Sequence, residues 1–344
     1  MPREAYAAIS LKLRDYFCRH REEALRGGRQ DVAAVPDAAT IHTMIDAAFW
    51  ASLRREEGFV PKISLAFLPV REDCSPIVLD RPIPLVPEAL ARVSPAVESP
   101  GIHLGVWRGE DDLYAWGMTR NIPELCFVLE VAAPGLLVIK HPSGDEPRKF
   151  VNVAVIEADR IKMIDASACG PASGFQSLDT TVKLAVSMRA HGRGGSLLVV
   201  PSSNRTWRES IVQPIPYAVS TPSCELAPVN DVVVNAIAGL SAVDGAVVLT
   251  DCYELLGFGA KIVRRKGWPQ VEQVTTSEPV EAAAPVLASP EQLGGTRHLS
   301  AAQFVQDQRD AAALVASQDG RFTIFEWSTS EQMVHAYRLD ALLL

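Results

Sequence analysis

Residues 231–250 read DVVVNAIAGLSAVDGAVVLT, and the first part of this stretch, residues 231–242, has the pattern of a helix. Asp244-Gly245 is a turn signal, and the apolar run Ala246–Thr250 predicts a buried strand. The same alternation continues on both sides. We expect helices at residues 178–189 and 299–307, and strands at 196–200, at 260–264 (entered from 254–259), at 312–316 and at 322–326. This order predicts an α/β domain in which helices flank a mixed sheet.

The N-terminal half has a different pattern. Residues 5–25 and 38–55 place apolar side chains at helical spacing. Strand-like runs separated by Pro, Gly and Asp follow at residues 63–70, 102–107, 114–118, 125–131, 136–140 and 151–157. We therefore predict an α+β domain with an antiparallel sheet. The Pro-rich stretch 76–100 is expected to be a long connection or an irregular flap.

Composition suggests where the domains begin and end. Residues 166–174 are small and offer little that could pack, which is typical of an exposed connection. We predict an N-terminal domain at 1–165, a linker at 166–177, a C-terminal domain at 178–330 and a tail at 331–344. Inside the C-terminal domain, residues 266–292 are rich in Glu, Pro and Ala and predict a mobile insertion.

The 344 residues are 48% hydrophobic, enough to bury a large core. Lys and Arg number 33 against 41 Asp and Glu, a net charge of −8 that argues against general binding of DNA or RNA. The first residues lack the apolar segment of a signal peptide, and no apolar run is long enough to span a bilayer. We therefore expect a cytoplasmic protein with no membrane partner.

Two segments carry groups suited to an anion. Gly294-Gly295-Thr296-Arg297-His298 precedes a predicted helix and offers a hydroxyl, a guanidinium and an imidazole near the helix N-terminus. Alone, this segment is equally compatible with a capped turn that carries a surface arginine. Asp244-Gly245-Ala246 alone is an ordinary turn. The glycine cluster 192–195 precedes a strand, whereas the glycines of phosphate loops follow one, so it does not predict such a loop.

The order of these segments resembles the diadenylate cyclase domain superfamily, which makes cyclic di-AMP from two ATP molecules. The resemblance covers roughly residues 178–330. It implies that Asp244 serves a Mg²⁺ or Mn²⁺ ion and the 3′-hydroxyl, and that Arg297 and His298 hold phosphate. The residues that would line the nucleotide pocket are Gly245, Ala246, Gly257, Gly295, Thr296 and Ser317.

The sequence also departs from this family at several positions. Leu299 stands where the family has a second arginine, and Val243 precedes the aspartate where active enzymes often have histidine. The family's Ser-Glu-Glu turn is Ser317-Gln318-Asp319 here, and its Leu-Pro-Leu segment is replaced by Gly257–Ala260. Together with the added N-terminal domain, these changes resemble the sensor-type branch called DACNV. Because phosphoryl-type transfer depends on positioning and charge, such losses should impair turnover more than binding.

Three functions follow, in this order of preference. The first is a nucleotide sensor whose C-terminal domain binds an adenine nucleotide or a cyclic dinucleotide without efficient catalysis and with no cofactor. The second is an active diadenylate cyclase, which would require Mg²⁺ or Mn²⁺ and a homodimer that apposes two Asp244 sites. The third is a scaffold whose N-terminal domain binds a protein and whose pocket binds nothing, being filled by side chains such as Phe258 or Leu299.

Overall fold

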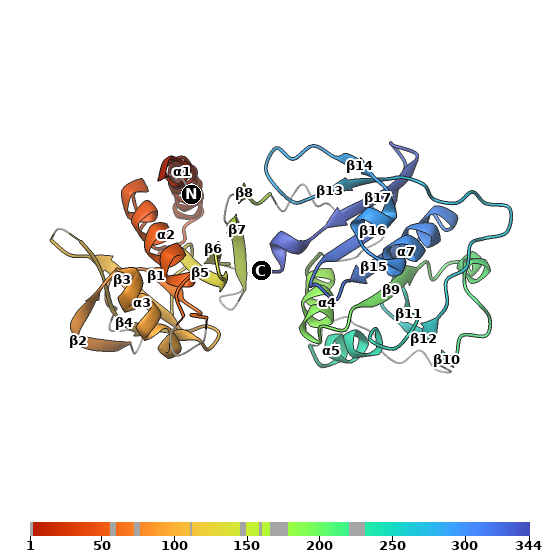
Figure 1. Ribbon diagram of the computed structural model, residues 1–344, viewed down its shortest axis with the longest axis horizontal. Coiled ribbons are helices and arrows are strands. Elements are labelled where there is room, and N and C mark those ends of the chain that lie inside the picture. The colour runs from red at the N-terminus through yellow and green to blue at the C-terminus, as the bar shows by residue number, and fades with distance from the viewer. Residues whose placement is uncertain are drawn as a thin grey trace. The chain divides into compact units, whose positions relative to one another are not determined.

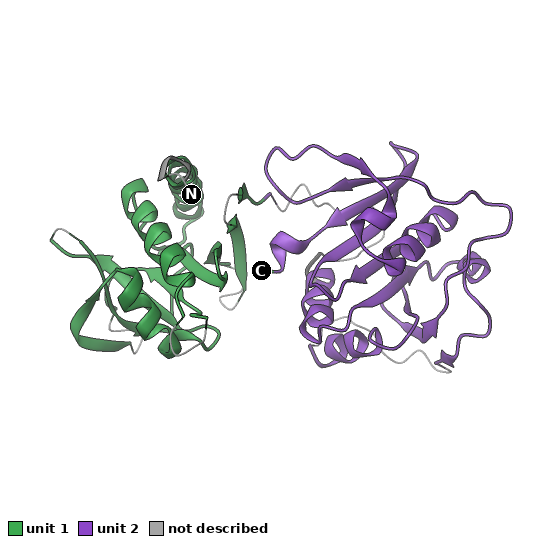
Figure 2. Ribbon diagram, in the orientation of Figure 1, with its two compact units in different colours: residues 1–164, 344 green, residues 165–343 purple. Residues whose placement is uncertain are grey.

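The computed structural model describes residues 3–55, 60–71, 76–110, 112–144, 149–157, 160–165, 178–219 and 231–344. The chain divides into two compact units, residues 1–164 with Leu344 and residues 165–343 (Figures 1 and 2). The linker expected at 166–177 lies outside the described residues. Each unit has its own sheet, and both sheets are mixed.

Unit 1 combines helices with a sheet whose strand order is β2-β4-β3-β1-β5-β6-β7-β8 within the described residues. Its helical segments are α1 (Arg3–Arg26), α2 (Ala38–Ser52), α3 (Pro87–Val93) and the 3₁₀ turn Ser94–Val97. Its strands are β1 (Ser64–Phe67), β2 (Ile77–Pro84), β3 (His103–Arg108), β4 (Leu113–Thr119), β5 (Val128–Ala133), β6 (Leu136–Pro142), β7 (Phe150–Glu157) and β8 (Arg160–Met163).

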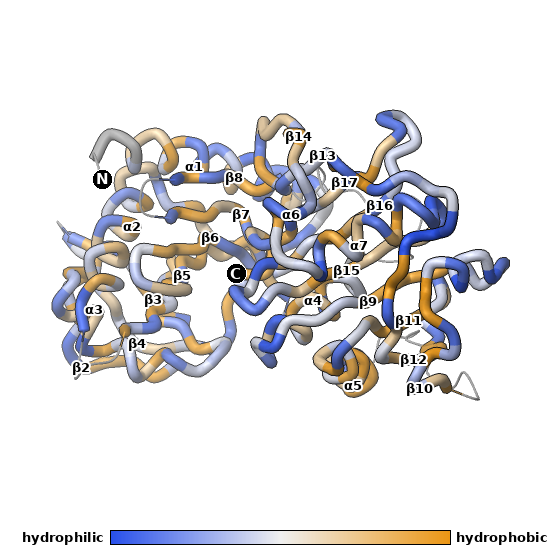
Figure 3. The backbone as a smooth tube through the Cα atoms, turned by 45° about the vertical axis from the view of Figure 1, so that its right-hand side comes forward, coloured by the Kyte–Doolittle hydropathy of each residue, from blue (hydrophilic) through white to orange (hydrophobic). Residues whose placement is uncertain are grey.

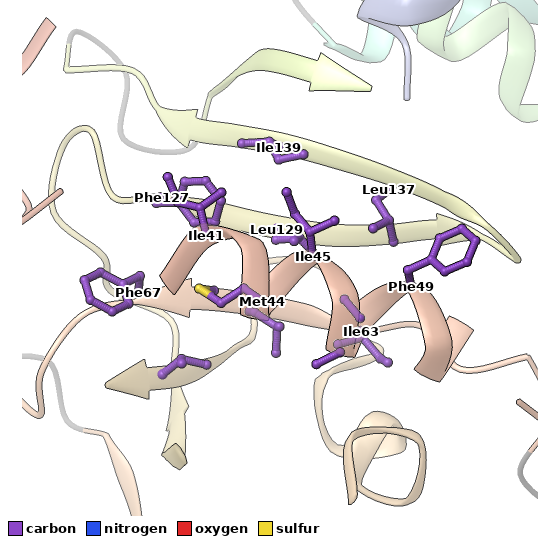
Figure 4. Close-up of a cluster of buried hydrophobic side chains, with 14 of the residues drawn as sticks. Ile41, Met44, Ile45, Phe49, Ile63, Phe67, Phe127, Leu129, Leu137 and Ile139 are labelled. Carbon is purple, nitrogen blue, oxygen red and sulfur yellow. The ribbon is translucent and has the colours of Figure 1, made fainter. Parts of the chain in front are cut away.

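Helix α2 packs its apolar face on this sheet. Asp37 caps the helix by accepting a 2.8 Å hydrogen bond from the backbone N–H of Thr40. The apolar side chains of α2 point toward those of β5, β6 and the segment before β5 (Figure 4). The labelled members of this core are Ile41, Met44, Ile45 and Phe49 of α2, with Ile63, Phe67, Phe127, Leu129, Leu137 and Ile139.

Two expectations for the N-terminal domain were wrong. The sheet is not purely antiparallel, because β1 and β3 pair in parallel. The segment between them contains β2 and α3 and is long enough for the crossover that a parallel pair requires. The stretch 76–100 is therefore part of a long connection between β1 and β3, as one expectation had it, and not an irregular flap. Pro82 and Pro84 obscured β2, which lies at the sheet edge, where a missing backbone N–H is tolerated.

Unit 2 has a sheet with the order β10-β12-β11-β9-β15-β16-β17-β13-β14 within the described residues. Its strands are β9 (Gly195–Val200), β10 (Tyr217–Ala218), β11 (Ala246–Thr250), β12 (Leu255–Ala260), β13 (Val274–Ser277), β14 (Val286–Ala288), β15 (Ala312–Ala316), β16 (Phe322–Ser328) and β17 (Met333–Arg338). Its helices are α4 (Leu178–Ala190), α5 (Asp231–Leu240), α6 (Pro290–Leu293) and α7 (Thr296–Asp307), with 3₁₀ turns at Thr206–Ser210 and Asp340–Leu342.

Helices cover both faces of the unit 2 sheet. Along β9, Leu198 and Val200 belong to the core under α7, whereas Leu197 and Val199 belong to the core under α4 and α5. This alternation follows from the two-residue period of a strand. Helix α5 is mostly hydrophobic (Figure 3). Unit 2 therefore has the expected mixed sheet between helices. Among the described helices, none is both long and apolar enough to cross a bilayer.

The structure differs from expectation at three places in unit 2. Residues 266–292 contain the paired strands β13 and β14 instead of being a mobile insertion throughout. The expected tail 331–344 contains β17, which pairs with β16 and β13 and buries Val334 and Ala336. The strand expected at 260–264 ends at Ala260. The first two differences come from the pairing of β17 with β13 and β16, which local composition does not specify.

Candidate functional site

A cleft of about 500 Å³ lies at one end of the unit 2 sheet, beside the N-terminus of α7. Its floor is a single row of paired residues across four strands, Ala260 on β12, Ala246 on β11, Ser196 on β9 and Val315 on β15. Their side chains are small, and Val315 is the largest of them. The residues that begin α7 form the facing wall.

The structure brings together eight of the nine predicted site residues. The cleft is lined by Asp244, Gly245, Ala246, Gly295, Thr296, Arg297, His298 and Ser317. Gly257 is the exception. It pairs with Val248 on β11 and Ala218 on β10, and a Cβ there would lie 2.9 Å from the carbonyl oxygen of Tyr217. Gly257 therefore permits the close approach of β10 and does not line the cleft.

Asp244 forms an ion pair that sequence reasoning missed. Its Oδ2 lies 2.5 Å from Nζ of Lys261, which also lines the cleft. The Asp244 side chain is 92% exposed and that of Lys261 is 51% exposed. The hydrogen bond and charge of Lys261, with a smaller contribution from Arg297, lower the pKa of Asp244. Asp244 is therefore ionised at neutral pH and already has a cationic partner.

Arg297 is an exposed cation at the start of α7. A Cβ on Gly194 would lie 3.3 Å from its Nη1, so the glycine cluster before β9 leaves room for this guanidinium. Among the described carboxylates, none forms an ion pair with Arg297. The backbone N–H groups of Thr296 and Arg297 lie in the first turn of the helix, where no preceding helical carbonyl can accept from them. This wall of the cleft is therefore rich in donors for an anion.

His298 is mainly a structural residue. It is 2% exposed, its Nε2 lies 3.4 Å from Oγ1 of Thr323, and its ring packs edge-on against Phe325. Burial lowers its pKa, so the imidazole is neutral at pH 7. A Cβ on Gly294 would lie 2.2 Å from the ring. The Gly-Gly sequence before α7 thus lets the chain pass over His298, and the ring contributes no positive charge to the cleft.

Ser317 lies in the turn after β15. Its hydroxyl donates to Asp319 and is the main cause of the lowered pKa of that carboxyl group. The backbone N–H of Ser317 donates to the carbonyl oxygen of Arg321 at 2.8 Å, which closes the turn. Gln318 from the same turn also lines the cleft.

Several lining residues were not predicted, and Lys261 is the most polar of them. The others are Ser196, Ala260, Ile262, Ser300, Val315, Ala316 and Gln318. Lys261 could not be predicted without the register of β11 and β12. Ala246 pairs with Ala260, and this pairing places Lys261 opposite Gly245, next to Asp244. Neither Phe258 nor Leu299 fills the cleft. Phe258 stacks on Tyr217 with ring centroids 4.7 Å apart, and Leu299 packs against the core under α7.

The cleft does not fit the divalent ion that the family resemblance implies. Asp244 is the one carboxylate among the residues that line it, and the Lys261 ammonium already occupies its Oδ2. Across the described part of the chain, no group of three or more His, Cys, Asp or Glu side chains could hold a metal. Mg²⁺ is usually held by one or two carboxylates together with phosphates and waters, and here the Lys261 ammonium competes for the one carboxylate that lines the cleft.

Comparison with known proteins gives a family match and 16 similar solved chains, two of which are described next, both with weak similarity. A hypothetical membrane-spanning protein from Bacillus cereus is 16% identical, with a TM-score of 0.30, over 47% of this chain and 63% of that one. A double mutant of DacA from Staphylococcus aureus is 12% identical, with a TM-score of 0.28, over 46% of this chain and 83% of that one. This chain therefore spans less than two thirds of the first of these structures. No protein with a curated description matches.

The family match falls in unit 1. Residues 30–120, which run from before α2 to the end of β4, match the family described as the probable sensor domain DACNV. The motifs that carried the resemblance to diadenylate cyclases, and the cleft they line, belong to unit 2. The chain thus combines a segment similar to a sensor domain with a separate α/β unit that contains the cleft.

Proposed function

We propose that the cleft of unit 2 binds an adenine nucleotide or a cyclic dinucleotide, and that the protein senses this ligand without efficient catalysis. The observation that carries the proposal is the position of Arg297. It is an exposed guanidinium in the wall of a cleft, beside backbone N–H groups of a helix N-terminus and near Lys261. This combination suits the oxygens of a phosphate group.

The size of the cleft supports a small-molecule ligand. A volume of about 500 Å³ falls in the range of pockets that enclose drug-sized molecules. The small floor residues Ala260, Ala246 and Ser196 keep this space open. The adenine part of the proposal rests on the order of the motifs around Asp244 and Arg297, since the geometry itself favours only an anion.

The ion pair between Asp244 and Lys261 favours a sensing role over catalysis. Lys261 engages Oδ2 of Asp244 and lowers the pKa of this carboxyl group, which makes Asp244 a weaker base for activating a hydroxyl. The similarity of residues 30–120 to a sensor domain agrees with this role. We place the protein in the cytoplasm, where such nucleotides are made.

Titration calorimetry of the full chain tests the proposal. ATP, ADP, cyclic di-AMP and cyclic di-GMP are each titrated into the protein, with inorganic phosphate as the control for a bare anion. We expect at least one adenine-containing ligand to bind, and to bind more tightly than phosphate. Absence of binding across the panel would reject the proposal.

A product assay separates sensing from catalysis. The chain is incubated with ATP and Mn²⁺, and the mixture is resolved by chromatography alongside the Asp244→Asn variant. We expect the amount of cyclic di-AMP to be the same in both samples and in buffer. Product that forms with the unaltered chain and is lost in Asp244→Asn would show a diadenylate cyclase instead.

A further inference from the structure

We infer that the cleft binds its ligand without a divalent cation, because the Lys261 ammonium supplies the positive charge at Asp244 that a metal ion would otherwise bring. This inference rests on the proposed function and concerns the form of the ligand that the site takes. It starts from the finding that the donor set of the cleft does not suit a metal.

Lys261 is placed by backbone geometry. Strands β11 and β12 are antiparallel, and Ala246 pairs with Ala260, so the next positions outward are Gly245 and Lys261. A Cβ on Gly245 would lie 2.4 Å from the carbonyl carbon of Gly259, which shows how closely the two segments approach. The carbonyl oxygen of Lys261 accepts a 2.9 Å hydrogen bond from the backbone N–H of Val212, and Ile262 forms a bridge with Ile211. The lysine is therefore held at the rim of the cleft.

The ammonium group of Lys261 can serve a ligand as well as Asp244. Both side chains of the pair are exposed to solvent, and exposed ion pairs contribute little to folding stability. A lysine ammonium has three donors. One can remain with Asp244 while another donates to a phosphate oxygen in the cleft. Asp244 then acts as a positioning residue that holds the lysine.

The charge of the cleft indicates the class of ligand. Lys261 and Arg297 carry positive charge, Asp244 carries negative charge, and the buried His298 is neutral. The lining residues thus leave one net positive charge. A nucleoside triphosphate carries far more negative charge than this and usually travels with a metal ion. A phosphodiester has one negative charge per phosphate, so a cyclic dinucleotide is the class that this metal-free cleft fits best.

Calorimetry in two buffers tests the inference, one with EDTA and one with Mg²⁺. Cyclic di-AMP and ATP are titrated into the full chain and into the Lys261→Gln and Lys266→Gln variants. Lys266 is a matched control, because it is exposed in the same segment but does not line the cleft. We expect cyclic di-AMP to bind the unaltered chain with the same affinity, within about threefold, in both buffers. Lys261→Gln should weaken this binding about tenfold or more in EDTA. Lys266→Gln should not change it.

A third arm measures Mn²⁺ alone by electron paramagnetic resonance, with Asp244→Asn as the reference. We expect no Mn²⁺ binding that depends on Asp244 up to a concentration on the order of 1 mM. Metal-dependent binding by the unaltered chain would overturn the inference. So would full affinity of Lys261→Gln in EDTA, or Mn²⁺ binding that Asp244→Asn abolishes. If neither nucleotide binds in either buffer, the proposed function fails, and the Mn²⁺ arm still decides whether Asp244 is a metal site.

Discussion

Arg297 presents a guanidinium to the cleft from the first turn of α7, and its charge should decide anion affinity. Replacing it by glutamine removes a charge-assisted hydrogen bond, which typically contributes about 1.5–3 kcal/mol. We therefore predict that Arg297→Gln weakens binding of the best ligand by roughly tenfold to one hundredfold. Calorimetry measures this loss.

The control for Arg297 is Arg264→Gln. Arg264 is exposed in the same unit and does not line the cleft. The Arg264→Gln variant should bind ligand as the unaltered chain does. The free energy of unfolding of both variants should lie within about 0.5 kcal/mol of that of the unaltered chain. Equal weakening by the two substitutions would mean that general charge attraction, and not the cleft, binds the ligand.

His103 in unit 1 should make that unit sensitive to acid. The ring is 2% exposed, and its Nδ1 lies 2.7 Å from Oγ of Ser64. Burial, helped by the charge of Lys140, lowers the pKa of His103 to about 4. Between pH 6.5 and 4 the unfolded chain binds a proton that the folded chain does not, so stability falls as pH decreases. The loss amounts to roughly 3 kcal/mol across that window.

Urea unfolding of unit 1 at several pH values measures this effect. The slope of stability against pH should become smaller in His103→Asn, where a neutral amide replaces the imidazole. His141, whose pKa is also lowered by burial, should maintain part of the slope. An unchanged slope in His103→Asn would contradict the assignment, whatever the overall stability of the variant.

At the scale of elements, β17 should be essential to unit 2. It lies between β16 and β13, and it buries Val334 and Ala336 in the core under α7. Deletion of residues 331–344 would leave the facing backbone groups of both neighbours without partners. We predict that unit 2 then loses cooperative unfolding, as measured by circular dichroism and limited proteolysis.

A substitution in the preceding turn gives the matched control. Gln332 has a φ of 54°, a conformation that glycine adopts readily. Gln332→Gly should therefore change stability by no more than about 0.5 kcal/mol. Retention of a cooperative, native-like unit 2 after the deletion would show that residues 331–344 are the tail that composition suggested.

Local patterns predicted the central elements of both units, and long-range pairing decided the rest. Helix α2 and strands β9, β11 and β15 were predictable, because their apolar residues repeat with a clear period and turn signals border them. The parallel pair β1–β3 and the strand β13 were not, because strand direction and sheet neighbours depend on segments far apart in sequence. Prolines and charges marked β2 and β13 as irregular, although both pair with other strands.

In the candidate site, too, some residues were predictable from the sequence and others depended on strand pairing. Residues of the two motifs were predicted because the order of the motifs along the chain resembles the diadenylate cyclase domain, whereas each motif alone is compatible with an ordinary turn. Lys261 was missed because nothing in its own segment distinguishes it from Lys266. Only the β11–β12 register shows which of the two lysines reaches Asp244.

At the scale of the whole molecule, the two units have separate hydrophobic cores. We predict two transitions in scanning calorimetry, of which ligand raises only the one that belongs to unit 2. A free ligand concentration of one hundred times the dissociation constant should raise the free energy of unfolding of that unit by about 2.7 kcal/mol.

Core substitutions assign the transitions. Leu129 and Leu197 are fully buried in units 1 and 2 respectively. Leu197→Ala should lower the free energy of unfolding of unit 2 by roughly 2–5 kcal/mol, and so lower the temperature of the ligand-sensitive transition. Leu129→Ala should do the same for unit 1 and the other transition. A single transition that both substitutions lower equally would mean that the units unfold together.

The floor of the cleft also fixes when, during protein synthesis, the site can first exist. Its four strands enter the sheet as β9, β11, β12 and β15, and the last floor residue to leave the ribosome is Val315. Residues 1–164 of unit 1 have emerged by then and can fold while the rest is translated. A nascent chain that stalls before β15 therefore carries the segment similar to a sensor domain but no binding pocket. The ligand cannot bind such a chain and so cannot stabilise it.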